Sequence, residues 1–216
     1  MKQRVADPAR LATPFAIVLG LVAILGRVPS HWAILVTVGV GLLGLIAPLP
    51  ASATTDSPAA PGPSAPTAAV STARRARQAM GQRSMATWLG AVALGVGALL
   101  IAGRLPGLLG IGLRGLVVRR AGAWAITASA LAGVAEELFF RRLVYGWLQL
   151  WGPAAAIGGS AVLFAAIHVP VYGFAVLPID MAAGLLLGWQ RWITGGWTAS
   201  GVTHVMANLI AEGVIA

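Results

Sequence analysis

Two adjacent carboxylates inside an apolar segment of membrane-spanning length constrain this chain more than any other feature. The segment runs from Leu131 to Leu150 (LAGVAEELFFRRLVYGWLQL) and contains Glu136, Glu137 and Arg141. An ionised carboxylate in hydrocarbon is costly, by roughly 2.5 kcal/mol or more on insertion scales. The whole chain has only six acidic residues. Placing two of them here indicates a functional site whose partners come from elsewhere in the chain.

The composition is that of a helical membrane protein. The 216 residues are 58% hydrophobic and only 10% charged, whereas a soluble domain carries roughly 25% charged residues. The apolar segments are continuous, unlike the alternating strands of an outer-membrane barrel. We therefore expect an all-α, polytopic membrane protein with about seven transmembrane helices. Abundant Arg, Ala and Gly favour a bacterial source, and with it a multi-pass protein of the cytoplasmic membrane.

The excess positive charge is explained by the membrane. The net charge is +9, and the Arg residues lie at the ends of apolar segments, where topology and anionic lipid account for them. Membrane lipid is therefore an expected partner, and nucleic acid is not. The absence of Cys excludes disulfides and thiolate metal sites.

The first half of the chain divides into three parts. Residues 1–49 predict a membrane helical hairpin with arms 11–26 and 32–49. A signal peptide ending at 51–53 competes with this reading but does not explain two apolar arms. Residues 50–84 are a Pro/Ala-rich linker, expected to be disordered, that ends in a basic cluster of Arg74, Arg75, Arg77 and Arg83. Residues 85–120 predict a third membrane helix and an interfacial segment.

Residues 121–216 predict a helical core. A long helix covers 121–150 and stops at Gly152 and Pro153, because Pro cannot continue the backbone ladder. A second helix is expected to end at His168, just before Pro170. A third segment, 172–192, is interrupted by Pro178 and by Asp180, to which the sequence assigns no role, and the last span covers 197–216.

Polar side chains in three of these helices form a candidate site. Glu137 and Arg141 are four residues apart on one helix face and predict an ion pair, while Glu136 is rotated by about 100° and can face a cavity. His168 follows Phe164 by one turn. His204 precedes Asn208 by one turn. Taken alone, His168 and the His204–Asn208 pair are more typical of structural packing, but together with the glutamate pair they indicate chemistry.

The chemistry that this set can perform is hydrolysis. Glu136 can take a proton from water, with His168 sharing or orienting that step. His204 and Asn208 can donate hydrogen bonds to an oxyanion. Alternatively, Glu136, His168 and His204 can hold a catalytic Zn²⁺ with one open position, although no H-E-x-x-H motif is present. The cofactor is therefore predicted as none or Zn²⁺.

The three motifs resemble those of a known family. Glu136-Glu137-x-x-x-Arg141, Phe164-x-x-x-His168 and His204-x-x-x-Asn208, in this order, are similar to the motifs of the CPBP intramembrane protease family, also called the Abi family. It groups type II CAAX prenyl endopeptidases with bacteriocin-processing and self-immunity proteins. The resemblance covers roughly residues 124–212. It adds nothing about residues 1–120.

The resemblance implies an α-helical intramembrane endopeptidase whose catalytic cavity lies in the C-terminal bundle and opens to one side, by analogy the cytoplasmic one. It implies Glu136 and His168 as water activators, His204 and Asn208 as oxyanion stabilisers, and Glu137 and Arg141 as supports. The family is labelled a metalloprotease family, and the same residues fit a metal-free mechanism. The expected substrate is a peptide or membrane-anchored protein, prenylated or not.

Two other functions compete with the protease. A non-catalytic scaffold or bacteriocin self-immunity protein would use the same polar groups to fix helix packing. An ion or proton pathway would explain intramembrane carboxylates and histidines, but the sequence shows no internal repeat of the kind common in transporters.

Overall fold

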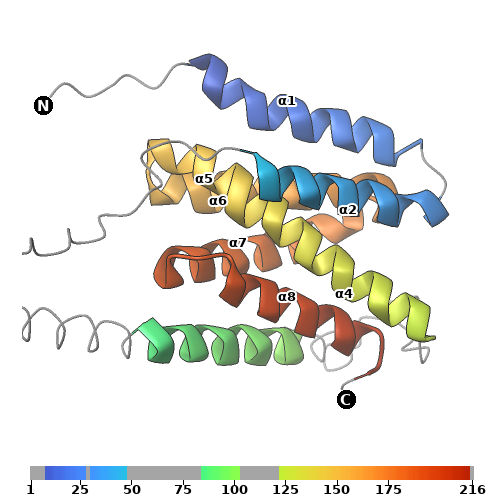
Figure 1. The fold of residues 1–216 in the computed structure, drawn as a ribbon, viewed down its shortest axis with the longest axis vertical. Helices are drawn as coiled ribbons and strands as arrows, with labels where there is room; N and C mark the ends of the chain where they lie inside the picture. Colours follow the sequence, from blue (N-terminus) through green and yellow to red (C-terminus); the bar gives the residue numbers. More distant parts are fainter. Residues whose placement is uncertain (1–7, 28–29, 48–83, 103–121, 215–216) are drawn as a thin grey trace, which may run out of the picture.

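The structure is a computed structural model that describes residues 8–27, 30–47, 84–102 and 122–214 (Figure 1). Within these ranges the chain forms helices and turns and no strand. The predicted all-α fold is therefore confirmed for the described part. Most of the Pro/Ala-rich linker with its basic cluster, and the interfacial segment at 103–120, lie outside the described residues.

The described elements follow one another as a series of helices. They are α1 (Pro8–Leu25), α2 (Ser30–Ile46), the helix Ser84–Ala102, α4 (Ala123–Glu137), the π-helix η2 (Leu138–Val144), α5 (Tyr145–Leu148), the 3₁₀ turn η3 (Gln149–Trp151), α6 (Pro153–Tyr172), the 3₁₀ turn η4 (Phe174–Val176), α7 (Leu177–Thr194) and α8 (Thr198–Ala211).

The helices α4 and α6 form the middle of the bundle. On one side α2 packs against α4 and α1 against α6; on the other, α8 packs against α4 and α7 against α6. Figure 1 shows the helix Ser84–Ala102 beyond α8, where Gln190 Nε2 donates to the carbonyl of Ala91 at 2.7 Å. The N-terminal hairpin is thus part of the same bundle as the C-terminal core.

The segment after the glutamate pair is a π-helix, where the sequence predicts a continuous α-helix. Its Phe139, Phe140, Arg141, Leu143 and Val144 are all buried, and four of these join the main hydrophobic cluster with Val18 of α1. A π-turn adds one residue per bond, i to i+5, and is frequent at functional sites. The π-helix is wider than an α-helix, and it lies where side chains on nearly every helix face are buried.

The expected end of the second core helix at His168 is wrong. Helix α6 continues through Pro170 to Tyr172, because a Pro inside a helix removes one backbone bond without ending the ladder. The break comes at Gly173, whose φ of 80° is left-handed. Pro178 does not interrupt α7 either. It lies in the first turn, where its missing N–H has no intrahelical partner to lose.

Small residues bring the helices close together. A Cβ on Gly184 of α7 would lie 2.9 Å from Ala161 Cα of α6, and one on Gly41 of α2 would lie 2.5 Å from Ala135 Cα of α4. Close backbone approach of this kind is typical of membrane helix interfaces. Arg142 adds a polar tie to the hairpin, because Nη1 donates to the carbonyl of Gly44 at the end of α2.

Among the described residues, three helices are long and apolar enough to cross a membrane: Ser84–Ala102, Ala123–Trp151 and Pro153–Tyr172. The described parts of α1 and α2 are shorter apolar helices. Helix α8 has 14 residues and rises about 21 Å, less than the roughly 30 Å of hydrocarbon. About seven spans therefore stays a prediction.

Candidate active site

Three helices bring Glu136, His168 and His204 together. The Nε2 atom of His168 lies 3.8 Å from Glu136 Oε2, and Nε2 of His204 lies 3.7 Å from the same oxygen. The three side chains are 14%, 18% and 11% exposed. They are thus mostly buried but not sealed inside the bundle. The sequence placed these residues on separate helices, and the structure joins them at one carboxylate oxygen.

His168 is held on both sides of its ring by its own helix. The Nδ1 atom lies 2.9 Å from the carbonyl oxygen of Phe164, one turn earlier. A carbonyl only accepts, so Nδ1 carries the proton and Nε2 of the neutral ring faces Glu136 with its lone pair. The rings of Phe164 and Tyr172 flank the imidazole, at centroid distances of 4.8 and 5.9 Å. His168 is therefore held with Nε2 directed at Glu136, where the neutral form of the ring can accept a proton.

Behind His204 lies a buried charge network. Nδ1 of His204 donates to Glu137 Oε1 at 3.0 Å, and the other oxygen of Glu137 lies 3.4 Å from Arg141 Nε. Glu137 and Arg141 are fully buried. The ion pair predicted from their i, i+4 spacing is present. It continues into α7, because Arg141 Nη2 donates to the Gly184 carbonyl at 3.4 Å.

Phe164 lies at the centre of the site. Its ring is 4.8 Å from the guanidinium carbon of Arg141 and 5.6 Å from the ring of His204, in addition to its contact with His168. A cation above an aromatic face is stabilised by the ring quadrupole. Phe164 thus contacts the buried Arg141 and both histidines.

Asn208 lies one turn after His204, and its amide nitrogen donates to the carbonyl of Ser129 in α4 at 2.9 Å. This bond ties α8 to α4 close to Gly133. A carboxamide has two N–H groups, so the bond to Ser129 leaves one for another acceptor. The structure brings together the carboxylate and both imidazoles of the predicted set, and it uses Asn208 first as a link between helices.

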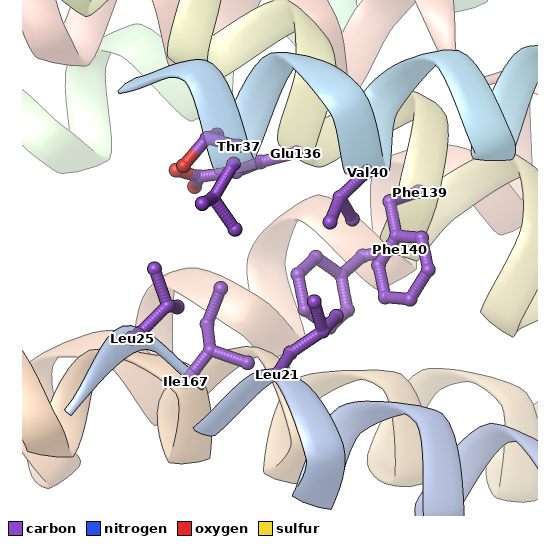
Figure 2. Close-up of a pocket in the computed structure, with 9 residues that line it drawn as sticks. Leu21, Leu25, Thr37, Val40, Glu136, Phe139, Phe140 and Ile167 are labelled. Atoms are coloured by element: carbon purple, nitrogen blue, oxygen red, sulfur yellow. The ribbon is translucent and has the colours of Figure 1, made fainter. Parts of the chain in front are cut away.

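An apolar pocket leads to Glu136 from the side of the N-terminal hairpin. Figure 2 shows the Glu136 carboxylate at one end and hydrocarbon side chains along the rest. The lining residues are Leu21, Leu25, Val36, Thr37, Val40, Glu136, Phe139, Phe140 and Ile167. Five of them come from α1 and α2. The helices α1 and α2, in a region to which the sequence assigns no role, therefore form a wall of the pocket.

The predicted zinc site has no counterpart in the described side-chain geometry. Among the residues that the structure describes, no three His, Cys, Asp or Glu side chains are arranged so that they can hold a metal ion. Glu136, His168 and His204 as they lie here thus do not meet the geometry of a metal site. Zinc binding stays a prediction of the sequence.

Sequence reasoning left one residue of this site without a role. Asp180 follows His168 by twelve positions, and the turn at Gly173 returns the chain so that α7 begins beside the end of α6. Its Oδ2 lies 3.4 Å from His168 Nδ1. The order of a predicted helix end, Gly173 and then Asp180 was the signal that could have placed Asp180 beside His168. A tight helical hairpin brings together residues on either side of its turn.

Comparison with known proteins gives one family match, in the C-terminal region of the chain. Residues 118–210 match the family model described as type II CAAX prenyl endopeptidase Rce1-like. Residues 118–210 belong to the CPBP intramembrane protease family. This confirms the resemblance drawn from the three motifs. Neither curated proteins nor solved structures give a match to the chain.

The match of residues 118–210 and the three long apolar helices indicate an integral membrane protein that carries a CAAX-type protease domain. The matched segment begins before α4 and ends within α8, so it contains Glu136, His168 and His204. The hairpin α1–α2 and the helix Ser84–Ala102 lie outside the match and pack directly on it.

Proposed function

We propose that this protein is an intramembrane endopeptidase that hydrolyses a peptide bond of a membrane-associated protein or peptide. The observation that carries the proposal is the convergence of His168 Nε2 and His204 Nε2 on one oxygen of Glu136, at 3.8 and 3.7 Å. The attacking water is proposed to bind beside this oxygen, where both imidazoles face it. The CPBP family match supports peptide hydrolysis over other reactions.

In the proposed reaction, Glu136 acts as the general base. The oxygen of a water bonds to the scissile carbonyl carbon while Glu136, assisted by His168, takes the proton. The carbonyl oxygen becomes an oxyanion. The proton then passes to the amide nitrogen, the C–N bond breaks, and the products are a carboxylate and an amine. The lone pair that Nε2 of His168 directs at Glu136 supports its role as the partner that receives and returns the proton.

His204 is proposed to stabilise the oxyanion as an imidazolium. Glu137 lies at its Nδ1, 3.0 Å away, and Glu136 lies 3.7 Å from its Nε2. A carboxylate beside each ring nitrogen favours the protonated ring, in which both nitrogens donate. The remaining N–H of Asn208 is proposed as a second donor. A preorganised donor of this kind contributes about 10²–10³-fold in kcat.

The substrate is proposed to be apolar next to the scissile bond, because seven of the nine residues lining the pocket at Glu136 are hydrocarbon. A prenylated CAAX-type C-terminus, as in the description of the matching family model, satisfies this requirement, and so does an unmodified membrane-anchored peptide. The competing proposal is a non-catalytic scaffold or self-immunity protein. It is favoured by the Asn208–Ser129 link, which ties α8 to α4.

Glu136→Gln tests the proposal. The purified protein in detergent is assayed with an internally quenched peptide that carries a farnesylated CAAX C-terminus, and with the same peptide without the lipid. We expect the variant to lose at least about 10²-fold in kcat and to keep its unfolding temperature, since Gln preserves shape. Undiminished cleavage by the variant would refute the proposed base. The scaffold hypothesis would be favoured if the wild-type protein cleaves neither peptide and Glu136→Gln lowers the unfolding temperature.

A further inference from the structure

We propose that Asp180 is a positioning residue for His168, an inference that rests on the proposed hydrolase function. The two side chains meet at Nδ1 and Oδ2, 3.4 Å apart, and are 18% and 16% exposed. His168 therefore lies between two carboxylates, with Glu136 at Nε2 and Asp180 at Nδ1. Carboxylate, imidazole and second carboxylate form one continuous line across α7, α6 and α4.

The carboxylate of Asp180 lacks another described partner at this oxygen. Oδ2 is buried and makes no hydrogen bond in the described part of the chain. A buried carboxylate oxygen without a donor costs free energy unless a charge faces it. The group that faces it is His168 Nδ1, whose proton is already directed to the Phe164 carbonyl at 2.9 Å. One N–H can be shared between two acceptors.

This arrangement divides two tasks between two acceptors. The Phe164 carbonyl fixes the tautomer, because it belongs to the same helix and cannot move away. Asp180 adds a negative charge that stabilises His168 when the ring receives a proton during catalysis. A buried carboxylate behind a catalytic histidine does the same in the serine protease triad. The first turn of α7, which carries Asp180, also favours a negative charge through the helix dipole.

The test compares Asp180→Asn, Asp180→Glu and Glu212→Gln with the wild type. Asn keeps the shape of Asp and removes its charge, so we expect kcat on the cleaved peptide to fall about 10–100-fold with KM changed less than about twofold. Glu restores the charge, and part of the loss in kcat should be recovered. Glu212→Gln removes a carboxylate from the end of α8 and should leave kcat unchanged. A merely structural role would lower the unfolding temperature without this split between kcat and KM.

A second measurement does not depend on activity. With ¹⁵N-labelled histidine, the Nδ1–H proton resonance of His168, assigned with His168→Gln, should move upfield in Asp180→Asn because the facing charge is lost. An unchanged resonance would overturn the inference whatever the activity. An unchanged kcat in Asp180→Asn while Glu136→Gln is inactive would also overturn it and leave the proposed function intact. Cleavage by Glu136→Gln would instead refute the proposed function, and the resonance would still decide whether Asp180 acts on His168.

Discussion

Removing one partner of the buried Glu137–Arg141 pair should destabilise the protein far more than removing both. In Arg141→Met, Glu137 Oε2 loses the cation 3.4 Å away inside a fully buried segment. His204 still donates to Oε1, but the second oxygen is left without its cation inside the bundle. Glu137→Gln is the reciprocal change, and the double variant removes both charges while Gln can still accept from His204.

The geometry sets the size of the effect. Two unit charges 3.4 Å apart attract by about 5 kcal/mol at an effective dielectric constant of about 20. Much of this attraction offsets the desolvation of the two ions, so the pair adds little net stability over an apolar isostere. Breaking it leaves one buried charge uncompensated, at about 3–5 kcal/mol for either single variant. We therefore expect the double variant to recover most of that loss, with a coupling energy of at least about 2 kcal/mol.

The assay is unfolding in mixed micelles of increasing SDS content, followed by intrinsic fluorescence, because the chain has eight Trp and no Cys for thiol dyes. Arg27→Met is the control. Arg27 is exposed and its side chain donates to the Ala23 carbonyl in the preceding helix α1, so the change should stay within about 0.5 kcal/mol. Additive destabilisation in the double variant would refute the coupling, and with it the idea that the pair acts as one buried unit.

Two further predictions concern the N-terminal hairpin and the metal. Gly44→Ala should destabilise the protein by about 1–3 kcal/mol and raise KM, because a Cβ there would lie 2.5 Å from the Leu138 carbonyl oxygen. Gly39→Ala on the same helix is the control, since a Cβ at that position meets nothing within 4 Å. Chemical denaturation and cleavage kinetics of both variants would check this, and equal effects of the two substitutions would contradict it. Cleavage should persist after treatment with a zinc chelator, measured alongside the metal content of the purified protein; loss of activity that Zn²⁺ restores would move Glu136, His168 and His204 to the role of metal ligands.

Local sequence spacing was enough to predict the parts of this site that lie on one helix. The i, i+4 spacing of Glu137 and Arg141 predicts their ion pair whatever the rest of the chain does, and the structure contains it. The same spacing places Phe164 one turn before His168, where its carbonyl meets Nδ1. The cost of burying charges in hydrocarbon then made it reasonable to expect Glu136, His168 and His204 in one place.

The path of the chain between helices was beyond such reasoning. The π-helix after Glu137 was missed, because its hydrogen-bond pattern responds to packing on every face of Leu138–Val144 and leaves no periodic signal. The end of α6 was misplaced because Pro170 looked like a stop, whereas the chain reverses only at Gly173, where a residue without a Cβ can adopt a positive φ.

The sequence by itself determined that this protein is a bundle of membrane helices with acidic and imidazole side chains inside it, because hydrocarbon makes such residues too costly to place without partners. Only the tertiary structure decided which partners meet. It put Asp180 behind His168 and made the hairpin α1–α2 a wall of the pocket at Glu136. Those contacts depend on how separate helices pack against one another. The periodic spacing of side chains along one helix carries no information about which helices pack beside it.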